Sequence, residues 1–196
     1  MGNKKIKFAV VGCGHIGKRH ASMILGNNDF ELVALCDTKP IEVLGLDNFN
    51  GARFFNSIDA LIQSGIEIDA VAIASPNGYH QEQALQVLEN NWHVVLEKPM
   101  ALTKAGCEQI IFKALQKQQQ VFCVMQNRYS PPSVWLKEVL VSGKLGKVFM
   151  VQINCYWNRD DRYYKPDATS GKSTTWHGTK ALDGGTLFTQ FSHFID

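Results

Sequence analysis

The sequence lacks the features that mark several large classes of protein. Its 20 Lys and Arg residues face 18 Asp and Glu residues, so a net charge of +2 gives no basic excess to attract nucleic acid or acidic lipid. No apolar run approaches the ~20 residues of a membrane-spanning helix, and residues 1–7 contain no signal-peptide core. The five cysteines are irregularly spaced and form no Cys-x-x-Cys pair. We therefore expect a soluble cytoplasmic protein that binds neither nucleic acid nor membrane.

The chain does contain enough apolar material for a folded core. Hydrophobic residues make up 45% of its 196 residues and charged residues 19%, a balance typical of globular chains. A domain of this length buries roughly 70% of the surface that its unfolded chain exposes.

Short apolar runs alternate with helix-like stretches from residue 5 to about residue 125. Strands are predicted at Ile6–Val11, Glu31–Cys36, Ala52–Phe55, Ile68–Ala74, Trp92–Leu96 and Val121–Met125. Helices are predicted at His15–Leu25, Ile58–Gln63 (with Ser57 as N-cap), Gln81–Glu89 and Thr103–Gln119. Strands that alternate with helical crossovers indicate an α/β fold, with a doubly wound parallel sheet covered by helices on both faces.

The pattern changes near residue 125, and we place the domains at residues 1–125 and 126–196. Ser133–Val141 predicts an amphipathic helix, and Lys147–Trp157 alternates in the manner of a half-buried antiparallel strand. Residues 158–182 predict a long loop, and Asp183-Gly184-Gly185 opens a helix over Thr186–Asp196. Because one strand makes no stable sheet, we expect an incomplete α+β second domain whose strand pairs with a missing part of the protein or with another chain.

The first strand leads into Gly12-Cys13-Gly14-His15-Ile16-Gly17, a G-x-G-x-x-G pattern that opens a helix. Gly12 permits the tight turn, Gly14 lets a pyrophosphate approach the backbone, and Gly17 lets the helix pack closely on the strand. The amide groups and the positive dipole end of the helix attract the phosphates. The motif predicts a dinucleotide site.

Asp37 ends the second strand, twenty residues after Gly17. A carboxylate there accepts hydrogen bonds from the ribose hydroxyls and repels a 2′-phosphate, which favours NAD over NADP although Lys39 softens the repulsion. We interpret His15 as a neighbour of the ribose or phosphate and His20 as a packing residue. Their spacing is off the i, i+4 pattern that brings two ligands together, and we expect no metal site.

Three further motifs accompany this frame. Ala74-Ser75-Pro76-Asn77-Gly78-Tyr79-His80 follows the fourth strand, Glu97-Lys98-Pro99-Met100-Ala101 follows the fifth, and Leu182-Asp183-Gly184-Gly185 precedes His193 and Asp196. In this order they resemble, over essentially the whole chain, the Gfo/Idh/MocA oxidoreductases (glucose–fructose oxidoreductase, inositol dehydrogenase and MocA). The resemblance implies a Rossmann domain that binds NAD(P), followed by an α/β domain whose open sheet faces the active site. It also implies a homo-oligomer, and oxidation or reduction of a secondary alcohol on a sugar, cyclitol or sugar nucleotide.

The resemblance assigns two catalytic residues, Lys98 beside the reacting hydroxyl and His193 as the group that takes its proton. A histidine suits proton transfer at neutral pH, and an ammonium group stabilises a developing alkoxide. The cofactor contacts expected from the glycine motif, the acid and the resemblance are Gly12, Gly14, His15, Ile16, Gly17, Asp37, Ser75, Pro76, Asn77, His80, Glu97, Lys98, Gln126 and Arg128.

Two departures from the family pattern point to its sugar-nucleotide branch. The glycine run begins with Asp183, and the position four before His193 is Thr189, followed by Gln190, where many members carry Asp. This is similar to the 3-dehydrogenases of UDP-N-acetylglucosamine or its uronic acid. The loop at residues 159–165 has cations and aromatic rings suited to a diphosphate and a base. The expected substrate contacts are Lys98, Arg159, Tyr164, Trp176, Thr189, Gln190 and His193.

The favoured interpretation is thus an NAD-dependent dehydrogenase that acts on C3 of a UDP-linked amino sugar or its uronic acid. Two alternatives stay open: a free sugar or cyclitol dehydrogenase with the same fold, and a dinucleotide-binding module without catalysis.

Overall fold

The computed structural model describes residues 4–49, 51–165 and 176–196. The chain divides into two compact units, Met1–Val124 and Met125–Asp196. Each unit is described by itself.

The first unit is built on a six-stranded parallel sheet in the order β3-β2-β1-β4-β5-β6. Its strands are β1 (Ile6–Val11), β2 (Phe30–Cys36), β3 (Arg53–Phe55), β4 (Ala70–Ile73), β5 (His93–Leu96) and β6 (Val121–Cys123). The predicted doubly wound α/β class is confirmed. From β1 the chain adds β2 and β3 on one side, and it then adds β4, β5 and β6 on the other. The direction therefore reverses between β1 and β4, and ligands of such sheets bind beyond the carboxyl ends of the strands at this point.

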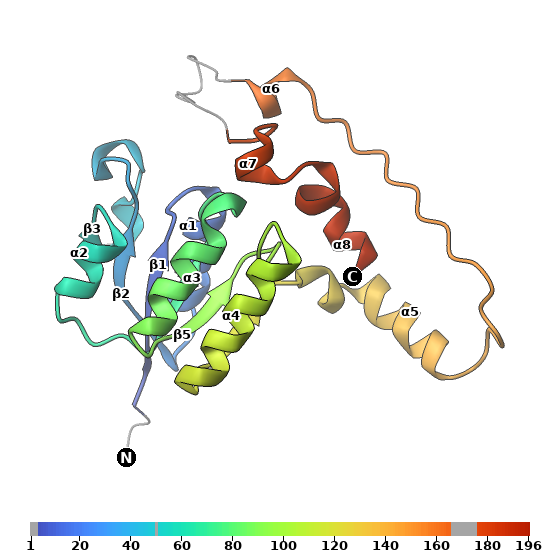
Figure 1. The fold of residues 1–196 in the computed structure, drawn as a ribbon, viewed down its shortest axis with the longest axis horizontal. Coiled ribbons are helices and arrows are strands. Elements are labelled where there is room, and N and C mark those ends of the chain that lie inside the picture. The colour runs from blue at the N-terminus through green and yellow to red at the C-terminus, as the bar shows by residue number, and fades with distance from the viewer. Residues whose placement is uncertain (1–3, 50, 166–175) are drawn as a thin grey trace. The chain divides into compact units, whose positions relative to one another are not determined.

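Helices cover both faces of this sheet (Figure 1). The helix α1 (His15–Leu25) packs on one face together with Leu44, Leu46 and the short 3₁₀ turn η2 (Asp47–Phe49). The 3₁₀ turn η1 (Ile41–Val43) precedes Leu44 and has no buried residue. The other face carries α2 (Ile58–Gln63), α3 (His80–Glu89) and α4 (Lys104–Lys117), with the 3₁₀ turn η3 (Asn77–Tyr79) before α3. Side chains of alternating direction explain the two cores: Val11 packs with the α2–α4 layer and Val10 with α1.

Local side-chain caps fix where two of these helices begin. The Ser57 hydroxyl oxygen accepts a hydrogen bond from the Ala60 N–H at 3.1 Å, as the sequence predicts. The Thr103 hydroxyl oxygen accepts one from the Gly106 N–H at 3.0 Å, which makes Thr103 the cap rather than the first residue of its helix. Such a cap typically contributes about 1 kcal/mol.

All the regular elements in the described part of the second unit are helical. It contains η4 (Gln126–Tyr129), α5 (Pro131–Val141), α6 (Asp161–Tyr164), α7 (Lys180–Asp183), the π-helical segment η5 (Leu187–Phe191) and α8 (Ser192–Ile195). The predicted loop at residues 158–182 therefore holds α6 and the start of α7. The predicted terminal helix forms, but its first half is π-helical rather than α-helical.

The strand predicted at Lys147–Trp157 does not form. Residues 148–160 belong to no helix or strand, and Figure 1 shows them as an extended trace between α5 and α6. A strand is defined by hydrogen bonds to a neighbouring strand, and the described residues of this unit include no other strand. The alternating pattern is real, but the partner that it needs is absent from the described part of the unit.

No helix in the described ranges is both long enough and apolar enough to cross a lipid bilayer.

Candidate active site

The glycine-rich turn after β1 allows close approach of three backbone segments. Gly12 has φ +85°, and a Cβ there would lie 2.6 Å from the Ser75 backbone N. A Cβ on Gly17 would lie 1.7 Å from the Gly12 carbonyl oxygen, so the helix α1 packs directly on the turn. Beside Gly14, in contrast, nothing lies within 4 Å of a Cβ position. Two glycines are thus required by packing, and the third leaves open space where the motif needs room for a phosphate.

The start of α1 offers backbone N–H groups to an anion. Gly14 is the N-cap residue, and no side chain caps this helix end. Positive partial charge at such an end favours phosphate groups. The open space at Gly14 and the uncapped amides fit the pyrophosphate of a dinucleotide.

Asp37 is hydrogen-bonded to the same turn. Its Oδ2 accepts from the Cys13 N–H at 2.7 Å, and its Oδ1 accepts from the Lys39 N–H at 2.9 Å. Each carboxylate oxygen can accept a further bond, so the fixed carboxylate can still receive ribose hydroxyl groups. This arrangement fits the predicted role of Asp37 in choosing NAD.

The loop after β4 is held by side chains of α3. The Ser75 hydroxyl donates to Gln83 Oε1 at 2.5 Å, and Asn77 is buried. His80 is fully buried; its Nε2 lies 2.9 Å from the Ser75 carbonyl oxygen and its Nδ1 lies 2.8 Å from the Pro99 carbonyl oxygen. His80 therefore joins the loop after β4 to the segment after β5.

The segment after β5 carries Lys98. Glu97 Oε1 lies 2.9 Å from His20 Nε2, and Glu97 Oε2 accepts from the Lys98 N–H at 3.3 Å. Burial lowers the pKa of the Lys98 ammonium below its usual range, while the Glu97 carboxylate opposes that shift. A lowered pKa and a nearby carboxylate are typical of a group that handles charge in a reaction.

His20 differs from its predicted role as a packing residue, because its ring makes a polar contact with Glu97. The sequence indicates only the side of α1 on which His20 lies, and it does not identify Glu97 as the partner. His20 follows Gly17 by three residues and so lies on the same side of α1, the side that packs on the turn.

The backbone ladder places these features along one edge of the sheet. The Gly12 N–H donates to the Cys36 carbonyl, the Ala74 N–H to the Val11 carbonyl and the Glu97 N–H to the Ile73 carbonyl. Four features thus follow the carboxyl ends of neighbouring strands: Asp37 follows β2, the glycine turn follows β1, the Ser75 loop follows β4, and Lys98 follows β5. The first unit brings its predicted cofactor residues together at the place where such a sheet binds ligands.

In the second unit, η4 holds the segment that carries His193. The Asn127 side-chain amide donates to the His193 carbonyl oxygen at 3.3 Å. The Arg128 guanidinium forms a two-pronged ion pair with Asp196, in which Nε donates to Oδ2 at 2.6 Å. Gln126 begins the same 3₁₀ turn. Cofactor contacts of Gln126 and Arg128 stay predictions, and the guanidinium has a structural partner within its own unit.

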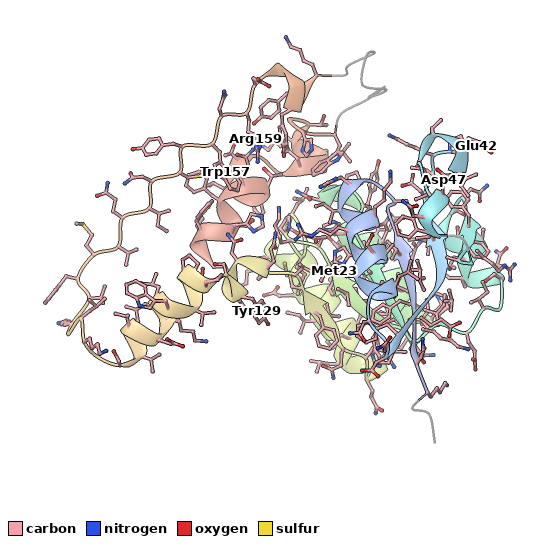
Figure 2. All side chains as sticks on the ribbon, turned by 180° about the vertical axis from the view of Figure 1, so that it is seen from behind. Met23, Glu42, Asp47, Tyr129, Trp157 and Arg159 are labelled. Atoms are coloured by element: carbon pink, nitrogen blue, oxygen red, sulfur yellow. The ribbon has the colours of Figure 1, made fainter. Side chains whose placement is uncertain are left out.

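The predicted substrate residues of the second unit fall into two groups: Arg159, Tyr164 and Trp176 in an aromatic cluster, and Thr189, Gln190 and His193 on the last helical segment. In the cluster, the Arg159 guanidinium lies 5.0 Å from the centre of the Trp157 ring and 4.8 Å from that of Tyr163 (Figure 2 labels Trp157 and Arg159). The Tyr163 ring stacks on the His177 ring with 4.0 Å between the ring centres, and the centre of the Trp176 ring lies 3.9 Å from that of His177. Tyr163 belongs to the loop at residues 159–165 whose aromatic rings the sequence pattern singles out, but neither Tyr163 nor His177 is among the expected substrate contacts.

The last helical segment begins at an acid-capped turn. Asp183 is buried, and its carboxylate accepts from the N–H groups of Gly178 and Gly185. Gly185 has φ +93°, a conformation that favours glycine. Thr189 and Gln190 are both buried, and the Thr189 hydroxyl donates to the Gly185 carbonyl oxygen at 3.1 Å. The residues before His193 are therefore fixed within the segment.

Comparison with known proteins agrees with this geometry. The model of the GFO/IDH/MocA family described as "Oxidoreductase family, NAD-binding Rossmann fold" matches residues 6–126, and the model of the GFO/IDH/MocA C-terminal domain matches residues 134–196. The crystal structure of the WlbA dehydrogenase from Bordetella pertussis, in complex with NADH and UDP-GlcNAcA, is 33% identical with a TM-score of 0.89, over 100% of this chain and 56% of that one.

The names of two curated relatives give substrates without a nucleotide. Glucose-6-phosphate 3-dehydrogenase of Bacillus subtilis is 28% identical over 97% of this chain and 52% of its own length. Inositol 2-dehydrogenase of Salmonella typhimurium is 32% identical over 74% of this chain and 44% of its own length. The chain thus spans about half the length of the curated relatives that it matches. With a family model matching most of its length, and with the glycine turn, Asp37 and Lys98 on one sheet edge, the chain belongs to the Gfo/Idh/MocA oxidoreductase family.

Proposed function

We propose that this chain binds NAD and acts, within the whole protein, as a dehydrogenase that oxidises a secondary ring hydroxyl, at C3, of a UDP-linked N-acetyl amino sugar or its uronic acid. One observation carries the proposal: Lys98 follows β5 on the same sheet edge as the glycine turn after β1 and Asp37 after β2. An ammonium group and a dinucleotide cradle on one edge of the sheet are parts that hydride transfer from an alcohol requires.

The protein residues have separate tasks in this reaction. The turn at Gly12–Gly17 would hold the pyrophosphate of a bound NAD, and Asp37 would accept hydrogen bonds from its ribose. NAD supplies the acceptor for the hydride that leaves the carbinol carbon. Lys98 donates a hydrogen bond to the reacting oxygen and stabilises the negative charge that develops on it. His193 takes the hydroxyl proton, so the alcohol becomes a ketone, with one hydride and one proton removed.

The substrate class rests on the second unit. The WlbA dehydrogenase structure contains UDP-GlcNAcA, and it resembles the whole of this chain. The cluster of Trp157, Arg159 and Tyr163 offers a cation and aromatic faces, which suit a diphosphate and a base. Thr189 and Gln190 place hydroxyl and amide groups on the segment before His193.

A second candidate is a dehydrogenase of free sugars or cyclitols. The observation that favours it is the 32% identity to an inositol 2-dehydrogenase over 74% of this chain. The two candidates share the chemistry of Lys98 and differ in whether a nucleotide is recognised.

A substrate panel tests both candidates. The full-length protein is mixed with NAD and with UDP-N-acetylglucosamine, its uronic acid or myo-inositol, and absorbance at 340 nm reports reduced nicotinamide. We expect turnover with a UDP sugar and at least a hundredfold loss in the Lys98→Met variant. Turnover with myo-inositol alone would move the assignment to the second candidate. Tight NAD binding without turnover on any of the three would instead favour a binding module without catalysis.

A further inference from the structure

Two histidines from different helices contact the segment Glu97–Pro99 on either side of Lys98. His20 on α1 reaches the residue before Lys98, with its Nε2 2.9 Å from Glu97 Oε1. His80, the first residue of α3, reaches the residue after it, with its Nδ1 2.8 Å from the Pro99 carbonyl oxygen. The short segment that carries the ammonium is therefore attached at both ends to helices on opposite faces of the sheet.

Both contacts are shielded from water. The side chains of His20 and Glu97 are 18% and 14% exposed, and His80 is fully buried. Water cannot easily replace a hydrogen bond that is lost at such a position, so removal of either ring leaves its partner unsatisfied. Each contact consequently restrains the segment more than an exposed pair would.

The two nitrogens of His80 face two carbonyl oxygens, those of Pro99 and Ser75. A neutral imidazole has one N–H, so it can donate to only one of them at a time. Burial lowers the pKa of His80 below its usual range, although both carbonyls oppose that shift. With a neutral ring, the tautomer decides whether the Pro99 or the Ser75 carbonyl receives the hydrogen bond.

We propose that His20 and His80 are positioning residues that hold the Glu97-Lys98-Pro99 segment from two helices and thereby set where the Lys98 ammonium lies. The inference rests on the proposed function in one respect, the catalytic role of Lys98. Neither histidine needs to touch substrate or cofactor for this role. His80 acts through the Pro99 carbonyl, and His20 acts through the Glu97 carboxylate.

Glu97 gives the arrangement a measurable signature. Its carboxylate is one of the charges that act on Lys98, and it raises the pKa that burial lowers. If His20 holds this carboxylate beside Lys98, loss of the contact lets Glu97 move away and lowers the pKa of Lys98 further. A residue that only stabilised α1 would leave that pKa unchanged.

Amide side chains provide matched variants, because Gln places its nitrogen near the position of a histidine Nε2 and Asn near that of Nδ1. His20→Gln keeps a donor for Glu97, whereas His20→Asn is too short. His80→Asn keeps a donor for Pro99, whereas His80→Gln keeps one only for Ser75. Both members of each pair lose the imidazole ring and carry a carboxamide. They differ by one methylene group, which decides which contact is retained.

The pKa of Lys98 is read directly in the full-length protein without substrate. Lysines are labelled by reductive ¹³C-methylation, the Lys98 signal is assigned with Lys98→Arg, and its shift is followed against pH by NMR. We expect a pKa lower by about half a unit or more in His20→Asn than in His20→Gln. We also expect kcat in His20→Asn and His80→Gln to fall ~10-fold or more below that of their partners. Within the His20 pair, the dissociation constant for NAD should stay unchanged, because His20 is not among the expected cofactor contacts.

Equal pKa values within the His20 pair, together with equal kcat within both pairs, would overturn the proposal and leave the rings a purely structural role. Thermal unfolding by circular dichroism shows which variants fold. If the His80 variants do not, the His20 pair and Glu97→Gln, which removes the charge from the other partner, still decide the question. The two proposals can fail separately. If the pKa of Lys98 differs within the His20 pair but the protein does not turn over UDP sugars, the proposed substrate is refuted and the positioning role stands.

Discussion

The Cys13 backbone N–H donates to Asp37 Oδ2 at 2.7 Å, so the glycine-rich turn and the acid that ends β2 form one hydrogen-bonded unit. The proposed phosphate cradle and the carboxylate proposed to accept the ribose are consequently fixed to each other in the absence of a cofactor. Preorganisation of this kind reduces the ordering cost of binding.

Asp37→Asn should weaken NAD binding about tenfold and reduce the preference for NAD over NADP, because the amide removes the negative charge that repels a 2′-phosphate. Titration of protein fluorescence with each dinucleotide measures both effects. Asp29→Asn is the matched control, since Asp29 is exposed and lies just before the opposite end of the same strand. An equal loss of NAD affinity in both variants would contradict the role given to Asp37.

Gly14→Ala and Gly17→Ala should separate binding from stability. The Gly14 position has open space, so the alanine variant should fold with a nearly unchanged melting temperature but lose NAD affinity at least tenfold. A Cβ on Gly17 would lie only 1.7 Å from the Gly12 carbonyl oxygen, so alanine there should destabilise the fold by about 1–3 kcal/mol. Calorimetry with and without NAD distinguishes the two. Wild-type NAD affinity in Gly14→Ala would show that no phosphate lies against that residue.

The pH dependence of turnover should reveal the charge on Lys98. Burial holds its pKa below the usual lysine value, and Glu97 opposes that shift. The active ammonium form is present below this pKa and disappears as the pH rises through it, so kcat should fall on the alkaline side. Glu97→Gln removes the opposing charge and should move this alkaline limb to lower pH by about one unit. A limb that stays in place, or moves upward, would exclude Lys98 as the titrating group.

The two buried cysteines should be unreactive in the folded protein. Burial is the main reason that the pKa values of Cys13 and Cys36 rise to about 12, which leaves roughly one thiol in 10⁴ ionised at pH 8. Iodoacetamide at pH 8 should therefore spare both, and modify them only after denaturation, as mass spectrometry of the peptides would show. Cys107 and Cys155, which are partly exposed, serve as internal controls. Rapid native labelling of Cys13 would mean that the glycine turn opens readily.

The fold of the first unit could be predicted because its signals are local. Buried parallel strands such as Ile6–Val11 appear as apolar runs, and caps such as Ser57 sit beside the helices that they start. The strand predicted at Lys147–Trp157 failed for the opposite reason. Alternation determines which side chains share a face, but it carries no information on whether a partner strand exists.

The candidate site was predictable where a motif sits at a strand end, as with Gly12–Gly17 and Glu97-Lys98-Pro99. The contact between His20 and Glu97 joins positions 77 residues apart in the sequence, and nothing in a single sequence pairs them. The π-helical geometry of Leu187–Phe191 was likewise not visible, because it depends on how the buried Thr189 and Gln190 are accommodated rather than on helix propensity.

The proposed dinucleotide cradle is made of main-chain amides around open space beside Gly14. Its donors consequently do not depend on the identity of the side chains at Cys13, His15 or Ile16. An engineer can therefore vary the exposed residues His15 and Ile16 without removing a donor. Cys13 is buried and the Asp37 carboxylate is bonded to the turn, so changes at these two positions would alter the shape of the cradle itself.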